Sequence, residues 1–212
     1  MDNYRITGMR AADGGARLTL YVTGSNGAGA PDYLTLTVLS SRLPSMPAVG
    51  PVDPETVSFL QKEDGVCRAM AYGLRALSAG DVSAAMLIGK MRVRGIPKAA
   101  ACEAADELAA RGYLDEKRAA RREAERGVGK LWGDRRILAD LSAKGFGQAA
   151  MAEAAEFLVG EDGGARCAEL IRKKRMTLPE EPRQQQKLFA ALARYGYASG
   201  EIKAALVAVF GQ

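Results

Sequence analysis

One pattern of apolar residues and glycine occurs three times between residues 87 and 209. In each copy, a pair of adjacent apolar residues lies eight and seven residues before a glycine, and another apolar residue lies four residues before it. A further apolar residue lies thirteen residues after the same glycine. The copies are Leu87, Ile88, Met91, Gly95 and Leu108; Ile137, Leu138, Leu141, Gly145 and Leu158; and Leu188, Phe189, Leu192, Gly196 and Val209. Such a repeat indicates tandem helical units that stack to share a core. Tandem units build extended surfaces that bind macromolecules more often than they form catalytic pockets.

Capping residues mark the expected helix boundaries. Asp53 followed by Pro54 predicts the start of a short leading helix that ends near Lys62, and Ser83 and Asp115 can cap later helices. The repeat glycines fit the left-handed position that ends a helix. We expect nine further helices in three sets of three, at 65–79, 82–94, 97–111, 115–127, 133–144, 147–159, 163–175, 183–195 and 199–210. The chain then divides into residues 1–53, 54–114, 115–162 and 163–212.

The first 50 residues are of a different kind. Apolar and polar residues alternate at 17–23 and 33–39, a further strand is expected at 4–7, and residues 12–15 form a turn signal. The glycine-rich segment 25–31 lacks the Lys-Ser/Thr ending of a phosphate-binding loop, so it predicts a hairpin loop. The expected fold is mainly α: tandem three-helix units that form an elongated curved rod, preceded by a small antiparallel β region.

Charge is distributed unevenly along the chain. The net charge is +5, yet residues 1–53 hold four basic and four acidic residues, so the excess lies in the helical part. A basic, extended surface favours a polyanionic partner, or a protein coated with one. A solvated, salt-bridged helix surface would explain the same charges. The residues predicted to contact a partner are Arg118, Arg121, Arg122, Arg126, Lys130, Arg135, Arg136 and Lys144, with Arg172, Lys173, Lys174 and Arg175 secondary.

The residue types offer little for catalysis. The chain has no histidine, and Cys67, Cys102 and Cys167 lack metal-ligand spacing, so we expect no catalytic site, metal or cofactor. Free thiols suit a reducing cytosol, and we expect neither a signal peptide nor a membrane span. Cys67 and Cys167 are expected to be small core residues. Trp132 is expected to hold the following helix against its neighbours, although an exposed interface anchor would also fit.

The tight corner at each repeat glycine also suggests a helix-turn-helix DNA reader. The helices after the corner are rich in alanine, however, and in the first two units they are acidic. Phosphate would repel such a face, and it offers few side chains for base edges. Sequence-specific DNA reading is therefore not expected, whereas salt-dependent contact with the DNA backbone stays open.

Two stretches of the middle unit form a specific motif. The first is Leu108 with Gly112-Tyr113-Leu114-Asp115. The second is Gly133 with Arg136-Ile137, Leu141 and Lys144-Gly145. With the basic helix between them, they resemble the RecX family pattern L-x3-G-Y-L-[DN], then G-x-x-R-I-x3-L-x-x-K-G. The resemblance covers about residues 55–212.

The resemblance implies a role in DNA recombination, repair and the SOS response. RecX proteins are cytosolic, non-enzymatic modulators of the RecA recombinase. They lie in the groove of the RecA–DNA filament and limit its growth, its ATP turnover and strand exchange. The expected partner is thus the RecA filament, bound by a monomer, with weak sequence-independent DNA contact. The alternative is a helical DNA-binding or transcription-related protein that acts without RecA.

Overall fold

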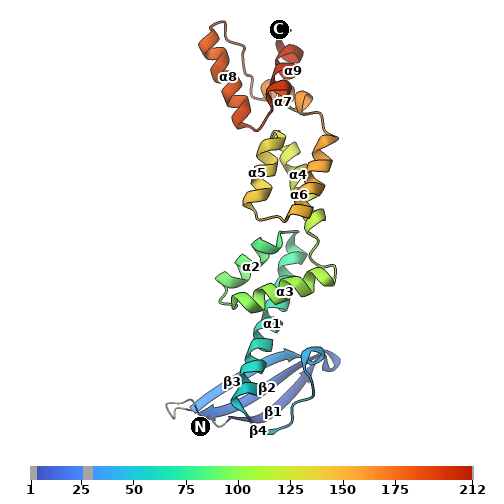
Figure 1. Ribbon diagram of the computed structural model, residues 1–212, viewed down its shortest axis with the longest axis vertical. Coiled ribbons are helices and arrows are strands. Elements are labelled where there is room, and N and C mark those ends of the chain that lie inside the picture. The colour runs from blue at the N-terminus through green and yellow to red at the C-terminus, as the bar shows by residue number, and fades with distance from the viewer. Residues whose placement is uncertain (1–3, 26–30, 212) are drawn as a thin grey trace. The chain divides into compact units, whose positions relative to one another are not determined.

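The computed structural model describes residues 4–25 and 31–211 (Figure 1). In these ranges the chain forms nine α-helices and four β-strands. The backbone divides into two compact units. The first combines residues up to Gly80 with Leu87–Leu114, and the second combines Asp81–Met86 with the chain from Asp115 onward.

A four-stranded antiparallel sheet opens the first unit. Its strands are β1 (Tyr4–Ala12), β2 (Arg17–Ser25), β3 (Pro31–Leu39) and β4 (Gly50–Val52), in the order β3-β2-β1-β4. The three expected strands and the turn after β1 are confirmed, and β1 is longer than expected. The short strand β4 was not expected. The centre of the predicted glycine-rich loop, residues 26–30, lies outside the described residues.

Helix α1 (Pro54–Ala79) packs on one face of this sheet. Val57 and Leu60 of the helix join a buried apolar cluster with Ile6, Leu18, Leu20, Val22, Leu36 and Val38 from the strands. The apolar residues of the alternating pattern are therefore the buried ones, because successive strand residues point to opposite faces. The other face of the sheet carries Tyr21 and Tyr33, both exposed.

The predicted break between a leading helix and the first unit is wrong, because α1 runs unbroken from Pro54 to Ala79. Asp53 caps its start as expected, accepting a hydrogen bond from the Thr56 amide at 2.7 Å. Gly65 does not end the helix. A Cβ there would lie 3.3 Å from Ala100, so this glycine permits close packing instead. Asp64, next to it, accepts a hydrogen bond from the Thr37 amide at 2.9 Å.

The first helical set consists of α1, α2 (Ala84–Val93) and α3 (Lys98–Ala110). In the first unit, α3 packs along α1 at Gly73, where a Cβ would overlap Leu108 and touch Met91. Leu87, Met91 and Leu108 of the repeat pattern are all buried. The first copy of the pattern thus supplies core residues, as predicted.

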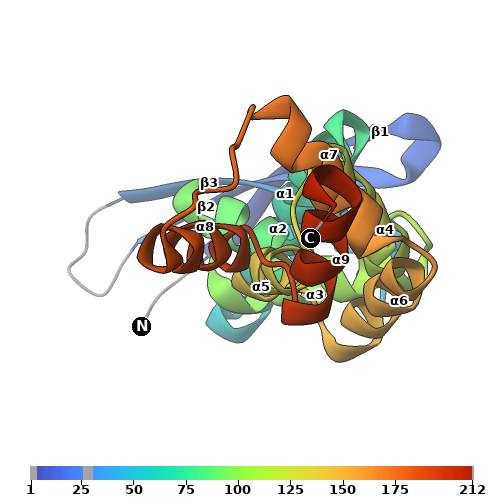
Figure 2. The same cartoon turned by 90° about the horizontal axis from the view of Figure 1, so that it is seen from above.

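The second unit contains two further sets, α4 (Glu116–Gly129), α5 (Asp134–Ala143) and α6 (Gln148–Val159), then α7 (Gly163–Lys173), α8 (Pro182–Arg194) and α9 (Ser199–Phe210). Each set has its own apolar cluster. In each set the first and third helices lie side by side, as α7 and α9 do (Figure 1, Figure 2). Gly145 and Gly196 have φ of 72° and 97°, so the expected left-handed corners are confirmed.

Candidate macromolecular interface

Most of the predicted basic residues on α4 are paired with carboxylates. Arg118 and Arg122 both reach Asp81, which lies just ahead of α2 in the second unit, with 3.3 Å from Arg118 Nη2 to Asp81 Oδ1. Arg121 lies 3.4 Å from Glu125 and 3.7 Å from Glu153, with its guanidinium over the Phe157 ring. These arginines remain about half exposed, so the pairs are surface interactions, each contributing about 0–1 kcal/mol.

Glu123 joins two other predicted residues. It pairs with Arg126 and lies 2.6 Å from Lys144 Nζ, which is also 2.7 Å from Asp140. Partial burial lowers the pKa of Lys144, but its hydrogen bonds to Asp140 and Glu123 outweigh burial and raise that pKa above its ordinary value. Five of the eight main predicted residues are therefore neutralised locally, which matches the salt-bridged surface that the sequence left open.

The other predicted cations form no ion pair within residues 4–25 and 31–211. They are Lys130, Arg135, Arg136, Arg172, Lys173, Lys174 and Arg175, and all are exposed. Arg172 donates to the Ala208 carbonyl at 3.3 Å. They come from the end of α4, the start of α5 and the end of α7.

Two aromatic rings gather three of these cations. The Arg136 guanidinium lies 4.3 Å from the Trp132 ring centre and 5.6 Å from that of Tyr195. Lys130 Nζ lies 4.8 Å from the Trp132 centre, and Lys174 Nζ lies 5.8 Å from the Tyr195 centre. We call Lys130, Trp132, Arg136, Lys174 and Tyr195 the cation–aromatic cluster. Each contact contributes about 0.5–1 kcal/mol at an exposed site.

The ends of α4 and α7 place the two lysines. Lys130 and Lys174 are the C-cap residues, and each precedes a residue with positive φ, Leu131 at 57° and Arg175 at 51°. The Trp132 amide then donates to the Gly127 carbonyl at 3.1 Å, which closes the turn. Trp132 is half-buried and packs against the α4–α6 apolar cluster. The expected packing role of Trp132 is thus confirmed, while its cationic neighbours keep it at the surface.

Direct helix-end contacts join α5 and α8 beside this cluster. The Gly133 amide donates to the Tyr195 carbonyl at 2.8 Å, and the Arg135 amide donates to the Gly196 carbonyl at 3.2 Å. A Cβ on Gly133 would overlap the backbone of Gly196. The two glycines therefore allow the start of α5 to meet the end of α8, which fixes Trp132 and Tyr195 near each other.

An equivalent contact joins the segment Asp81–Met86 to the end of α5, both within the second unit. Ser83 donates through Oγ to the Lys144 carbonyl at 2.5 Å, and the same oxygen accepts from the Met86 amide at 3.1 Å. The expected cap at Ser83 is thus confirmed. The Ala84 amide donates to Glu116 Oε1 at 2.7 Å.

Arg166 is the one buried cation in the second unit's described residues, with 6% exposure. It pairs with Asp134 at the start of α5, while its Nε and Nη1 atoms have no hydrogen-bond partner. Burial raises the pKa of its neighbour Tyr197, whose hydroxyl donates to the Leu131 carbonyl at 2.8 Å. Burial also raises the pKa of Cys167 to about 11, so this thiol stays protonated, as suits a small core residue.

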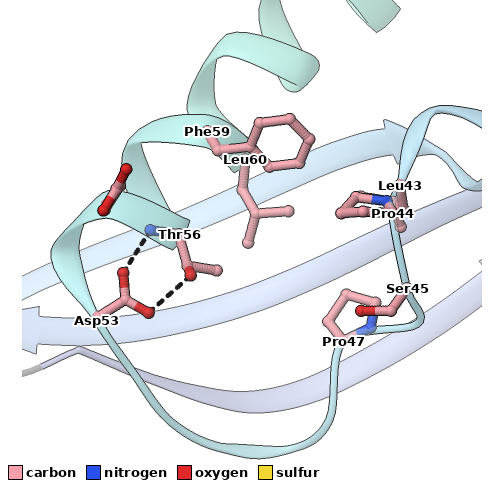
Figure 3. A pocket seen from close by; sticks show the side chains of 9 residues that line it. Leu43, Pro44, Ser45, Pro47, Asp53, Thr56, Phe59 and Leu60 are labelled. Carbon is pink, nitrogen blue, oxygen red and sulfur yellow. Dashed lines mark hydrogen bonds between the residues drawn. The ribbon is translucent and has the colours of Figure 1, made fainter.

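A cleft of about 520 Å³ lies elsewhere, between the segment after β3 and the start of α1 (Figure 3). Leu43, Phe59 and Leu60 line it with prolines, and among its polar residues Asp53 accepts hydrogen bonds from the amide and hydroxyl of Thr56 (Figure 3). The described residues hold no group of three His, Cys, Asp or Glu side chains that could bind a metal ion. The cation–aromatic cluster is therefore the more distinctive surface.

Comparison with known proteins places this architecture. No protein-family model and no curated protein matches the chain. A crystal structure of regulatory protein RecX superposes with a TM-score of 0.70 at 18% identity, covering 99% of this chain and 100% of that one. The crystal structure of RecX from Lactobacillus salivarius gives a TM-score of 0.59 at 18% identity, over 69% of this chain and 97% of its own. The chain has the RecX fold.

The first of these structures matches the small sheet as well as the helical sets, because that comparison extends over nearly the whole chain. The expected class, mainly helical with a small antiparallel β region, is confirmed. Within the described ranges, none of the helices has the length and apolar character needed to cross a membrane. The division into four segments and the role of each basic residue stay predictions.

Sequence reasoning missed three residues of this surface. Tyr195 directly precedes the repeat glycine Gly196, so its position beside a helix corner was visible in the repeat. Asp81 was not recognised as a partner of the basic helix, because it is 37 residues or more from the arginines it binds, and Glu123, three residues from Arg126, was overlooked.

Proposed function

We propose that this protein is a RecX-like regulator that binds the RecA–DNA filament in the cytoplasm as a monomer. It limits filament growth, ATP turnover and strand exchange in recombination and DNA repair, and it uses no cofactor. The observation that carries the proposal is the match to a RecX crystal structure over 99% of this chain. The motif from Leu108 to Gly145 adds support from the residues themselves.

The unpaired cations are the best candidates for contact with the filament. Lys130, Arg135 and Lys174 have no carboxylate partner among the described residues. Their full positive charge can therefore attract the phosphates or carboxylates of a partner. Arg118, Arg121, Arg122, Arg126 and Lys144 are held by ion pairs and contribute less, and Arg172, Lys173 and Arg175 extend the surface along the end of α7.

The test is the DNA-dependent ATPase of RecA on single-stranded DNA. Wild-type protein should inhibit it, and the triple variant Lys130→Glu, Arg135→Glu, Lys174→Glu should raise the half-inhibitory concentration about tenfold or more. The matched control reverses three exposed cations elsewhere in the second unit, Arg183→Glu, Lys187→Glu and Lys203→Glu, and should inhibit like the wild type.

Equal inhibition by both triple variants would show that the surface is wrong. A wild-type protein that neither inhibits RecA nor sediments with its filaments, but binds duplex DNA tightly and sequence-dependently, would instead establish the alternative of a DNA-binding protein that acts without RecA.

A further inference from the structure

The face of the sheet turned away from α1 presents a regular pattern. Its residues alternate with those of the buried cluster: Arg5, Gly8 and Arg10 on β1, Thr19, Tyr21 and Thr23 on β2, and Tyr33, Thr35 and Thr37 on β3. Tyr33 is 77% exposed and Tyr21 is 42% exposed. We call these nine residues the open sheet face.

The two tyrosines are diagonal neighbours on adjacent strands. Tyr21 stands opposite Thr35, and Tyr33 stands opposite Thr23, two positions along. Such residues lie about 7–8 Å apart. Gly8 faces Tyr21 on β1, and a Cβ there would lie 3.4 Å from the tyrosine ring, so the ring lies over bare backbone. The Tyr21 ring therefore packs on the β1 backbone at Gly8, whereas the Tyr33 ring is largely exposed.

An arginine accompanies each tyrosine. Arg5 and Thr23 line a hollow with Tyr33, while Arg10 and Thr19 line another with Tyr21. None of the nine residues of the open sheet face is acidic. Asp13 lies in the turn after β1, where it pairs with Arg17. The face therefore carries positive charge although residues 1–53 as a whole are neutral.

We propose that the open sheet face binds single-stranded nucleic acid. Unpaired bases stack on Tyr21 and Tyr33, and the phosphates between them contact Arg5 and Arg10. Stacking on aromatic side chains tolerates any base and needs bases that are not already paired. A sheet with exposed aromatic residues is a common platform for such binding.

Charge argues against a second copy of this chain as the occupant, because two such faces would bring like charges together. Two exposed rings flanked by arginines supply the two contacts that a single strand needs, ring faces for bases and guanidinium groups for phosphates. The proposal is independent of RecA, since it concerns the first unit alone, and it is tested without RecA.

The experiment measures fluorescence anisotropy of a labelled oligothymidylate and of a duplex of equal length with the full chain. The wild type should prefer the single strand, and the double variant Tyr21→Ala, Tyr33→Ala should lose about tenfold or more in affinity. The control Tyr113→Ala removes another exposed tyrosine and should bind like the wild type. Tyr21→Phe with Tyr33→Phe keeps both rings and should also retain binding.

Photocrosslinking to an iodouracil-containing strand separates this face from the cations of the second unit, and the products should include Tyr21 or Tyr33. Arg5→Ala with Arg10→Ala should weaken binding and reduce its dependence on salt. The proposal is overturned if the alanine double variant binds like the wild type, if crosslinks fall only within residues 115–211, or if duplex binds as tightly as the single strand.

Discussion

Two helix junctions in the second unit occupy equivalent positions in the repeat and are built from different chemistry. Ser83 and Gly133 are 50 residues apart, and the residues that they contact, Lys144 and Tyr195, are 51 apart. The first junction uses a side-chain hydroxyl, whereas the second uses the backbone amide of Gly133, which packs against Gly196. The repeat therefore preserves the place of the contact and not the residues that make it.

The carboxylate also changes sides between the two junctions. At the first, the Ala84 amide donates to the Glu116 carboxylate. Fifty residues later, Asp134 and Arg166 occupy the same two positions, and the carboxylate has moved to the other partner. Both pairs join the starts of two helices, α2 with α4 and α5 with α7, where the partial positive charge of a helix start stabilises a carboxylate. The shared helix geometry explains why either chemistry serves.

The largest effect is expected at the buried pair. Asp134→Ala leaves Arg166 without a carboxylate and should lower the free energy of unfolding by about 3 kcal/mol. Arg166→Met removes the buried charge itself and should cost less, about 1 kcal/mol or below. Urea unfolding followed by the fluorescence of Trp132, the chain's single tryptophan, measures both. Equal losses in the two variants would contradict the claim that an unpaired buried cation is what costs stability.

A smaller effect is expected from filling the backbone contact of the second junction. Gly133→Ala places a methyl group against the Gly196 backbone and should cost about 1–3 kcal/mol. Gly129→Ala is the matched control, because a Cβ there meets nothing within 4 Å. The same unfolding assay should show the control to be unchanged or slightly more stable. If Gly133→Ala were as stable as the wild type, the two helix ends would not be packed as closely as described.

The smallest effect concerns the first junction. Ser83→Ala removes both the cap of α2 and the bond to the Lys144 carbonyl. It should lower the free energy of unfolding by about 1–2 kcal/mol, measured by thermal unfolding. Ser142→Ala, at an exposed position of α5, should leave the free energy of unfolding within about 0.5 kcal/mol of the wild-type value. Should both serines behave alike, the side-chain contact would be dispensable and the two junctions would differ less than proposed.

Local signals in the sequence predicted most of the helices, because caps and corners depend on residues a few positions apart. Asp53, Ser83 and Asp115 all cap as expected. The predicted end of the leading helix near Lys62 was wrong, because the chain stays helical through Gly65, which permits close packing against a helix 35 residues away. Strand β4 was missed because Gly-Pro-Val is short and contains residues that are unusual in strands.

The candidate site could be predicted only in part. Composition located the cations but not their partners, since the carboxylates that neutralise α4 include Asp81 and Glu153 from other segments. Which cations remain unpaired is a property of tertiary packing. The cation–aromatic cluster likewise depends on Tyr195 and Trp132, which are brought together from two repeats.

The direction of the two junctions bears on how the protein matures on the ribosome. Each junction finishes an earlier helix with a carbonyl that is translated 61 or 62 residues later, at Lys144 for Ser83 and at Tyr195 for Gly133. A nascent chain therefore lacks these two contacts until the following repeat has emerged, although the local cap bond from the Met86 amide to Ser83 can already form. Each helix start thus gains the last of its contacts from a repeat that is synthesised after it.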